Sequence, residues 1–219
     1  MSKERPILFN TEMVQAIQTG RKTQTRRLVK QPPIIGDIMR DAKGWYYEDG
    51  TRNGHSLIPP YSPGDILWVR ETWGKLTECN VFPPYEPHQE RFIYRADVGD
   101  PDHFQAKWRP SIHMPKEAAR IFLRVKDIRV ERLQEITEEQ AILEGCSTGT
   151  VVITCDPMGV EVDPDDPQDW TAVEDFEYIW NSTIKPADKN VYGWKANPWV
   201  WVITFEQCQK PEGWCEARS

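Results

Sequence analysis

The first thirty residues place the strongest constraint on how this chain can fold. Residues 5–9, Arg-Pro-Ile-Leu-Phe, predict a short strand, and Asn10 or Thr11 can cap the helix that follows. Gly20 ends that helix, because glycine readily adopts the left-handed backbone of a helix end. The alternation at 24–29 predicts a second strand. The polar residues between helix and strand therefore lie at a junction, where side chains project into clefts.

That junction has an unusual composition. Residues 20–27 read Gly-Arg-Lys-Thr-Gln-Thr-Arg-Arg and gather one lysine, two threonines and three arginines. A lysine can act as a base when its pKa is depressed, and threonine hydroxyls can act as nucleophiles or bind an oxyanion. Arginines suit phosphate or carboxylate groups. The alternative interpretation is a solvated basic turn without a functional role.

Length and charge limit the classes of protein to consider. The chain has 219 residues, enough for one large domain or two small ones with a substantial core. Its net charge of −7 argues against a protein that coats nucleic acid through a broad basic face. A small basic pocket in an acidic shell is compatible with this charge and favours a defined ligand.

The sequence predicts neither a membrane span nor a metal site. It has no apolar run of about 18 residues and no visible export signal, so we expect a soluble protein in the cytoplasm. The five cysteines form no Cys-x-x-Cys pair and are expected to be reduced. Cysteines and histidines do not fall into metal-ligand spacing, and no cofactor is expected.

The remaining elements predict an α+β fold. Further strands are expected at 45–47, 66–70, 92–94, 120–130 and 198–205, and further helices at 137–145 and 171–184. Strands dominate, which suits a small closed barrel with about three helices outside it. Glu144 stands in the last turn of its helix, where a carboxylate opposes the helix dipole. Its presence therefore suggests a role other than helix stability.

Three separated segments resemble one family, the ASCH domain. They are 20–27 (Gly-Arg-Lys-Thr-x-Thr-x-Arg), 63–69 (Pro-Gly-Asp-Ile-Leu-Trp-Val) and 136–145 (Ile-Thr-Glu-Glu-Gln-Ala-Ile-Leu-Glu-Gly). Residues 70–73, 108–115 and 197–202 are similar to the longer, phage- and prophage-encoded members. The resemblance spans residues 5 to about 206 and implies a PUA-like β-barrel. We expect a single domain over 1–219, with insertions at about 31–60, 74–90, 95–107 and 147–170.

The resemblance also implies a chemistry. Some compact ASCH proteins resemble amidohydrolases that remove the acetyl group of N4-acetylcytidine with a lysine, a threonine and a glutamate. On this sequence those positions are Lys22, Thr25 and Glu144. Amide hydrolysis needs a nucleophile, a base and a proton donor. The resemblance therefore predicts Thr25 as nucleophile, Lys22 as base and Glu144 as proton donor.

Several alternatives stay open at this point. The same cleft would serve a ribonuclease, or an RNA- or nucleotide-binding module without catalysis, with Lys22 and Arg26 contacting phosphate. A phage accessory protein that binds a host protein through the acidic loop at 156–169 is a further reading. Arg70 and Glu71 are expected at the cleft or as an exposed ion pair, and Trp73 either stacks on a base or packs in the core. The predicted substrate-binding residues are Arg21, Thr23, Arg26, Arg70, Glu71 and Trp73.

Overall fold

The computed structural model describes residues 2–29, 37–42, 44–48, 53–75, 92–98, 107–147, 149–150 and 169–214. The chain divides into two compact units, each assembled from separate stretches of sequence. The first unit comprises Met1–Thr23, Tyr61–Ile128 and Thr204–Ser219, and the second comprises Gln24–Pro60 and Arg129–Ile203. Most of the expected insertions, and the acidic loop up to residue 168, lie outside the described residues.

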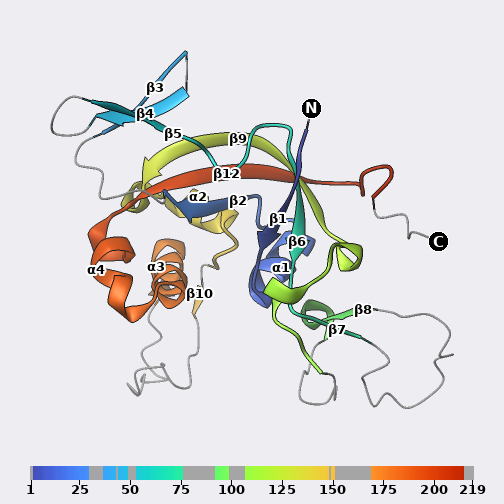
Figure 1. Cartoon of the computed structure of the whole chain (residues 1–219). Coiled ribbons are helices and arrows are strands. Elements are labelled where there is room, and N and C mark those ends of the chain that lie inside the picture. Colours follow the sequence, from blue (N-terminus) through green and yellow to red (C-terminus); the bar gives the residue numbers. More distant parts are fainter. Residues whose placement is uncertain are drawn as a thin grey trace, which may run out of the picture. The chain divides into compact units, whose positions relative to one another are not determined.

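A five-stranded sheet has the strand order β1-β6-β9-β12-β2 (Figure 1). Its strands are β1 (Glu4–Leu8), β2 (Gln24–Leu28), β6 (Ile66–Arg70), β9 (Phe122–Arg132) and β12 (Trp199–Cys208). β1 and β6 are parallel, whereas β6 and β9 are antiparallel. The order begins at β1 and ends at β2, so the described strands do not close into the expected barrel. The α+β class is confirmed.

Smaller sheets and short helices complete the described chain. β3 (Ile38–Asp41), β4 (Gly44–Glu48) and β5 (Gly54–Leu57) form an antiparallel sheet, and β7 (Trp73–Lys75) pairs with β8 (Phe92–Tyr94). β10 (Gly149–Thr150) pairs with β11 (Asp169–Trp170). Short 3₁₀ helices lie at Arg95–Asp97, Ser111–His113, Lys116–Ala118, Leu133–Glu135, Pro186–Asp188 and Trp194–Ala196.

In the first unit, helix α1 (Thr11–Gln18) leads to the polar segment. The Asn10 side chain accepts a hydrogen bond from the backbone N of Met13, which satisfies one of the free N–H groups at the helix start. Gly20 has φ of 76°, so it adopts the left-handed conformation that the sequence predicts for the helix end. Both helix boundaries therefore follow from local sequence signals.

In the second unit, α2 (Glu138–Leu143), α3 (Ala172–Thr183) and the short α4 (Lys189–Tyr192) are the α-helices of the described part. Thr137 and Thr171 cap α2 and α3 with complete capping boxes, as the sequence predicts for α2. Apolar side chains of α2 and α3 share one core with Val200 and Val202 of β12. Helices α2 and α3 thus pack on the face of β12 that carries Val200 and Val202.

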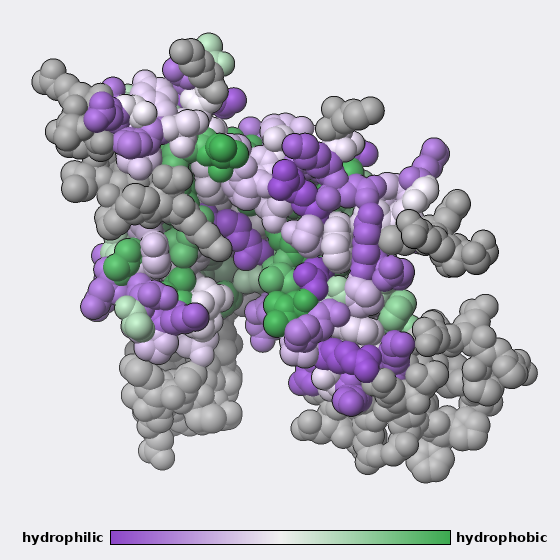
Figure 2. Space-filling view, in the orientation of Figure 1, coloured by the Kyte–Doolittle hydropathy of each residue, from purple (hydrophilic) through white to green (hydrophobic). Residues whose placement is uncertain are grey.

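The described residues on one face of the molecule are mainly hydrophilic (Figure 2). On the face drawn in Figure 2, hydrophilic residues predominate and apolar residues form only small groups. Ile58 and Ile112 are the most exposed large apolar side chains among the described residues, at 84 % and 56 %. In this part of the chain, no helix combines the length and apolar character needed to cross a membrane.

Candidate functional site

The predicted polar segment is largely buried. The exposed fraction is 2 % for Lys22 and 3 % for each of Gln24, Thr25 and Arg26. Arg21 is exposed, and Thr23 is half-buried. The interpretation as a solvated basic turn is therefore wrong for the four buried side chains, because such a turn would keep its charged groups in water.

Lys22 belongs to the first unit and is the largest of its fully buried side chains. Its backbone N donates to the carbonyl of Ala16 at 2.9 Å, which fixes the chain as it leaves α1. The Nζ atom lies 5.5 Å from the centroid of the Phe9 ring, within the range of a cation–π contact. The Phe9 ring in turn packs against Phe205. Lys22 is therefore held beside an aromatic pair of the core.

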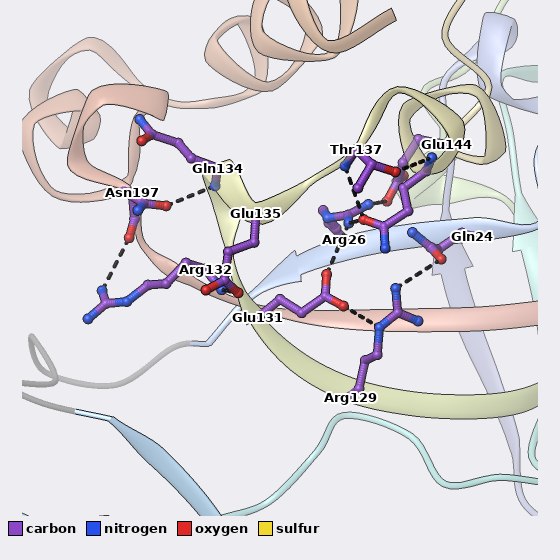
Figure 3. Close-up of polar contacts among 11 residues, drawn as sticks. Gln24, Arg26, Arg129, Glu131, Arg132, Gln134, Glu135, Thr137, Glu144 and Asn197 are labelled. Carbon is purple, nitrogen blue, oxygen red and sulfur yellow. Dashed lines mark hydrogen bonds and ion pairs between the residues drawn. The ribbon is translucent and has the colours of Figure 1, made fainter.

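In the second unit, Arg26 is the centre of a buried polar network (Figure 3). Its Nη1 donates to Glu144 Oε1 at 3.1 Å. Its Nη2 donates to Glu131 Oε2 at 3.1 Å and to Gln140 Oε1 at 2.6 Å. The Arg26 side chain is 0 % exposed, and its guanidinium carbon lies 5.7 Å from the centroid of the Phe176 ring. One guanidinium thus joins three acceptors in a site closed to solvent.

A second arginine extends this network. Arg129 on β9 donates from Nε to Glu131 and from Nη2 to Gln24 Oε1, the latter at 3.4 Å. Within the described residues, two buried donors of the network have no acceptor, Gln24 Nε2 and Arg26 Nε. A buried donor left without an acceptor costs about 1–3 kcal/mol. The network is therefore not fully satisfied.

Strand alternation explains which side chains meet. Successive residues of a strand leave on opposite faces, so Gln24, Arg26 and Leu28 share one face of β2. Leu28 packs against the core formed by α2, α3 and β12, which places this face toward the helices. Thr25 therefore leaves β2 on the face opposite Arg26. Its side chain and that of Glu144 consequently lie on different sides of the strand.

The end of α2 brings Glu144 to Arg26. Glu144 is the C-cap residue of the helix, and its exposed fraction is 5 %. Gly145 follows with φ of 94°, so the helix stops at the point where the carboxylate reaches the guanidinium. The unfavourable position of this carboxylate in the helix dipole is offset by a cation from a distant strand.

Glu71, in the first unit, does not form the expected exposed pair with Arg70. Glu71 is 1 % exposed, and Arg120 binds it through two bonds of 2.9 Å each, Nε to Oε1 and Nη2 to Oε2. Arg70 instead donates to the carbonyl of Ile112 and lies over the Trp68 ring. The expectation of an Arg70–Glu71 ion pair is wrong, because Glu71 is turned into the interior.

Arg120 links Glu71 to other ionisable groups of the first unit. It also donates to Asp97, and its guanidinium lies 3.8 Å from the centroid of the Tyr94 ring. Burial raises the pKa of Glu71, and the bonds from Arg120 oppose this. Burial also raises the pKa of Tyr94, to about 12. Burial acts in the raising direction on Asp97 as well, but hydrogen bonds from Arg120 and Gln18 outweigh it and lower the pKa of that carboxyl.

Trp73 packs in the core of the first unit. It is 5 % exposed, belongs to an apolar cluster with Ile66 and Phe122, and meets Phe92 edge-on at 5.6 Å. The guanidinium of Arg109 lies 5.0 Å from the centroid of its ring. Of the two expectations for Trp73, core packing is the one that the structure supports.

The predicted catalytic residues are thus divided between the two units. Lys22 lies in the first, whereas Thr25 and Glu144 lie in the second. Sequence reasoning did not single out Glu131, Gln140, Gln24 or Arg129 as neighbours of Arg26. Gln140 had a local signal as the capping-box partner of Thr137, and Arg129 and Glu131 share one face of β9 by alternation.

Within the described ranges, no group of three or more His, Cys, Asp or Glu residues is placed to hold a metal ion. Comparison of the chain with known protein families, with curated proteins and with solved structures finds no match.

Proposed function

We propose that this chain is an ASCH-like protein with a PUA-like fold that acts in the cytoplasm as a hydrolase on an acylated nucleoside such as N4-acetylcytidine. Lys22 serves as the base, Thr25 as the nucleophile and Glu144 as the proton donor. The observation that carries the proposal is the burial of these polar side chains, at 2 %, 3 % and 5 % exposure.

The burial of Lys22 is the strongest support. Lysine is among the residues least often found in a protein interior, because its ammonium loses hydration there. Removal of water favours the neutral amine over the ammonium. A neutral amine is the form that can accept a proton from a threonine hydroxyl. In the proposal, this burial is what suits Lys22 to the role of a base.

The proposed reaction proceeds in two steps. The Thr25 hydroxyl oxygen attacks the acetyl carbonyl, and its proton passes to the Lys22 amine. The bond between the carbonyl carbon and N4 of cytidine then breaks, and Glu144 gives a proton to N4, so that cytidine leaves. In the second step, water attacks the acetyl ester on Thr25 and gives a proton to Glu144. The ester bond breaks, the Thr25 oxygen takes the proton back from Lys22, and acetic acid leaves and ionises to acetate.

The positions of Thr25 and Glu144 constrain how a substrate would bind. Thr25 leaves β2 on one face, whereas Glu144, at the end of α2, lies on the other face of this strand. β2 is the last strand in the sheet order. The attacked carbon and the leaving nitrogen are directly bonded, so a substrate could meet both groups only around the edge of β2.

RNA cleavage or RNA binding receives less support from the same residues. Both readings place Lys22 and Arg26 against phosphate groups. The Arg26 side chain is 0 % exposed, and two carboxylates already bind its guanidinium. A phosphate would have to displace Glu131 or Glu144 to reach it. A small neutral substrate therefore fits the proposal better than a polyanion.

The test is a product assay with two substrates. The purified chain is incubated with N4-acetylcytidine and, separately, with a structured RNA, alongside Lys22→Ala, Glu144→Ala and the control Lys126→Ala. Lys126 pairs with Glu206 on the surface and is 53 % exposed. We expect cytidine and acetate from the wild type and the control, and from neither site variant. RNA cleavage lost with Lys22→Ala, or binding without turnover, would overturn the proposal in favour of the alternatives.

A further inference from the structure

We propose that Arg26 is a positioning residue that fixes the carboxylate of Glu144 and does not contact the substrate. The catalytic part of this inference rests on the proposed function, whereas its structural part stands on the geometry of the second unit alone. It revises the sequence-based expectation that Arg26 binds substrate.

The hydrogen bonds of Arg26 hold its guanidinium in one orientation. Glu144 accepts from Nη1, and Glu131 and Gln140 both accept from Nη2. Because the guanidinium is planar and rigid, fixing Nη2 between two acceptors also fixes the direction of Nη1. The ring of Phe176 lies against the same group. The Glu144 oxygen is therefore placed by Arg26, which is itself held by Glu131 on β9, Gln140 on α2 and the Phe176 ring on α3.

Glu131 is itself held in place from the other side. Arg129 donates to the second carboxylate oxygen of Glu131, so each oxygen of this side chain binds a different arginine. Gln140 is anchored by the capping box of α2, where its Oε1 accepts from the backbone N of Thr137 at 3.3 Å. Both groups that orient Arg26 thus have fixed positions of their own.

The network is poorly explained as a source of stability. Burying two charges costs desolvation free energy, and a pair of this kind is often neutral or unfavourable compared with apolar residues of the same volume. Gln24 Nε2 and Arg26 Nε add two buried donors without acceptors in the described chain. Glu144 also opposes the dipole of α2. An arrangement that is costly in these respects is consistent with selection for the position of the carboxylate.

Arg26 is also unsuited to direct contact with a substrate. Its side chain is closed to solvent, and both terminal nitrogens are bonded to protein acceptors. A substrate contact would require one of these bonds to break. A residue that acts through Glu144 should change the turnover number and leave the Michaelis constant nearly unchanged.

The experiment compares Arg26→Lys, Arg26→Met and Glu131→Gln with the control Arg132→Lys. Arg132 is on the same strand as Glu131, where it donates to the carbonyl of Asn197 and lies over Trp199. With N4-acetylcytidine as substrate, we expect kcat to fall on the order of 10- to 100-fold in Arg26→Lys and KM to stay nearly unchanged. Lysine keeps the positive charge but lacks the planar guanidinium that binds several acceptors at once. Arg26→Met should behave alike, and Glu131→Gln should show a smaller loss.

A second readout does not depend on activity. The ¹³C resonance of the Glu144 side-chain carboxyl is followed in the wild type and in each variant. We expect the chemical shift of this resonance to change in Arg26→Lys and in Glu131→Gln and to stay the same in Arg132→Lys. The wild-type Glu131 side chain is 18 % exposed. If the wild type hydrolyses no acylated nucleoside, the proposed function fails and this resonance decides the inference. An unchanged resonance, or a raised KM with unchanged kcat, would overturn it.

Discussion

Arg26 donates from Nη1 to Glu144 Oε1 at 3.1 Å, although 118 positions separate the two residues in the sequence. The bond joins the second strand of the chain to the end of α2, and both partners are almost fully buried. This ion pair offsets the unfavourable interaction between the Glu144 carboxylate and the dipole of α2.

This buried pair should show strong coupling in a double-mutant cycle. Arg26→Met leaves the buried Glu144 carboxylate without its cation and should lower the free energy of unfolding by roughly 3–5 kcal/mol. Glu144→Leu should cost less, because Glu131 still pairs with Arg26. The double variant should lose much less than the sum, because it removes both charges together. Urea unfolding of the four proteins measures the coupling, and strictly additive losses would contradict it.

A surface pair supplies the matched control. Lys126 Nζ lies 3.2 Å from Glu206 Oε1, with side chains 53 % and 51 % exposed. The same cycle with Lys126→Met and Glu206→Leu should give a coupling of about 0–1 kcal/mol, because water screens the charges. A coupling as large as that of the buried pair would show that burial is not its cause.

Gly20 should resist substitution for a purely conformational reason. Its φ is +76°, and a Cβ built on it would meet no atom within 4 Å. Gly20→Ala should therefore cost about 1–2 kcal/mol through the left-handed backbone alone. Gly54→Ala is the control, because that position is equally open and its φ is not in the left-handed range. Thermal unfolding compares them, and equal losses would refute the explanation.

The raised pKa of Tyr94 predicts that the folded state loses stability at alkaline pH. Its hydroxyl donates to the carbonyl of Ala118 at 2.6 Å, and burial raises its pKa from 10.0 to about 12. A raised pKa means that the folded state favours the protonated phenol more than the unfolded state does. The resulting stability is fully present below pH 10 and is lost as pH rises through 12.

The measurement compares the wild type with Tyr94→Phe, which cannot ionise at this position. The difference between their free energies of unfolding, from urea titrations at pH 8, 10 and 11, should shrink above pH 10. A difference that is constant over this range would show that the pKa of Tyr94 is the same in both states.

Local signals made the helices predictable. Asn10 and Thr137 begin their helices where side-chain oxygens can accept from free backbone N–H groups, and glycines end α1 and α2. These interactions span only a few residues, so the sequence displays them directly. The pairing of strands and the closure of a sheet join distant residues, and the expected closed barrel had no comparable local signal.

For the candidate site, the sequence singled out residues and not their contacts. The resemblance pointed to Lys22, Thr25 and Glu144, and all three prove to be buried. The partners of the charged groups were not predictable, because proximity in sequence is a poor guide to contact. Glu71 binds Arg120 and not its neighbour Arg70, and the acceptors of Arg26 come from β9 and α2.

The most direct test of the account is the effect of Lys22→Arg on the deacetylation of N4-acetylcytidine. Arginine keeps the positive charge and much of the length, but its guanidinium does not lose its proton in proteins and cannot serve as a base. We predict a fall in kcat/KM on the order of 10²–10⁴-fold, the usual contribution of a general base, with Lys126→Arg unaffected. A Lys22→Arg variant that retains the kcat/KM of the wild type would contradict the account.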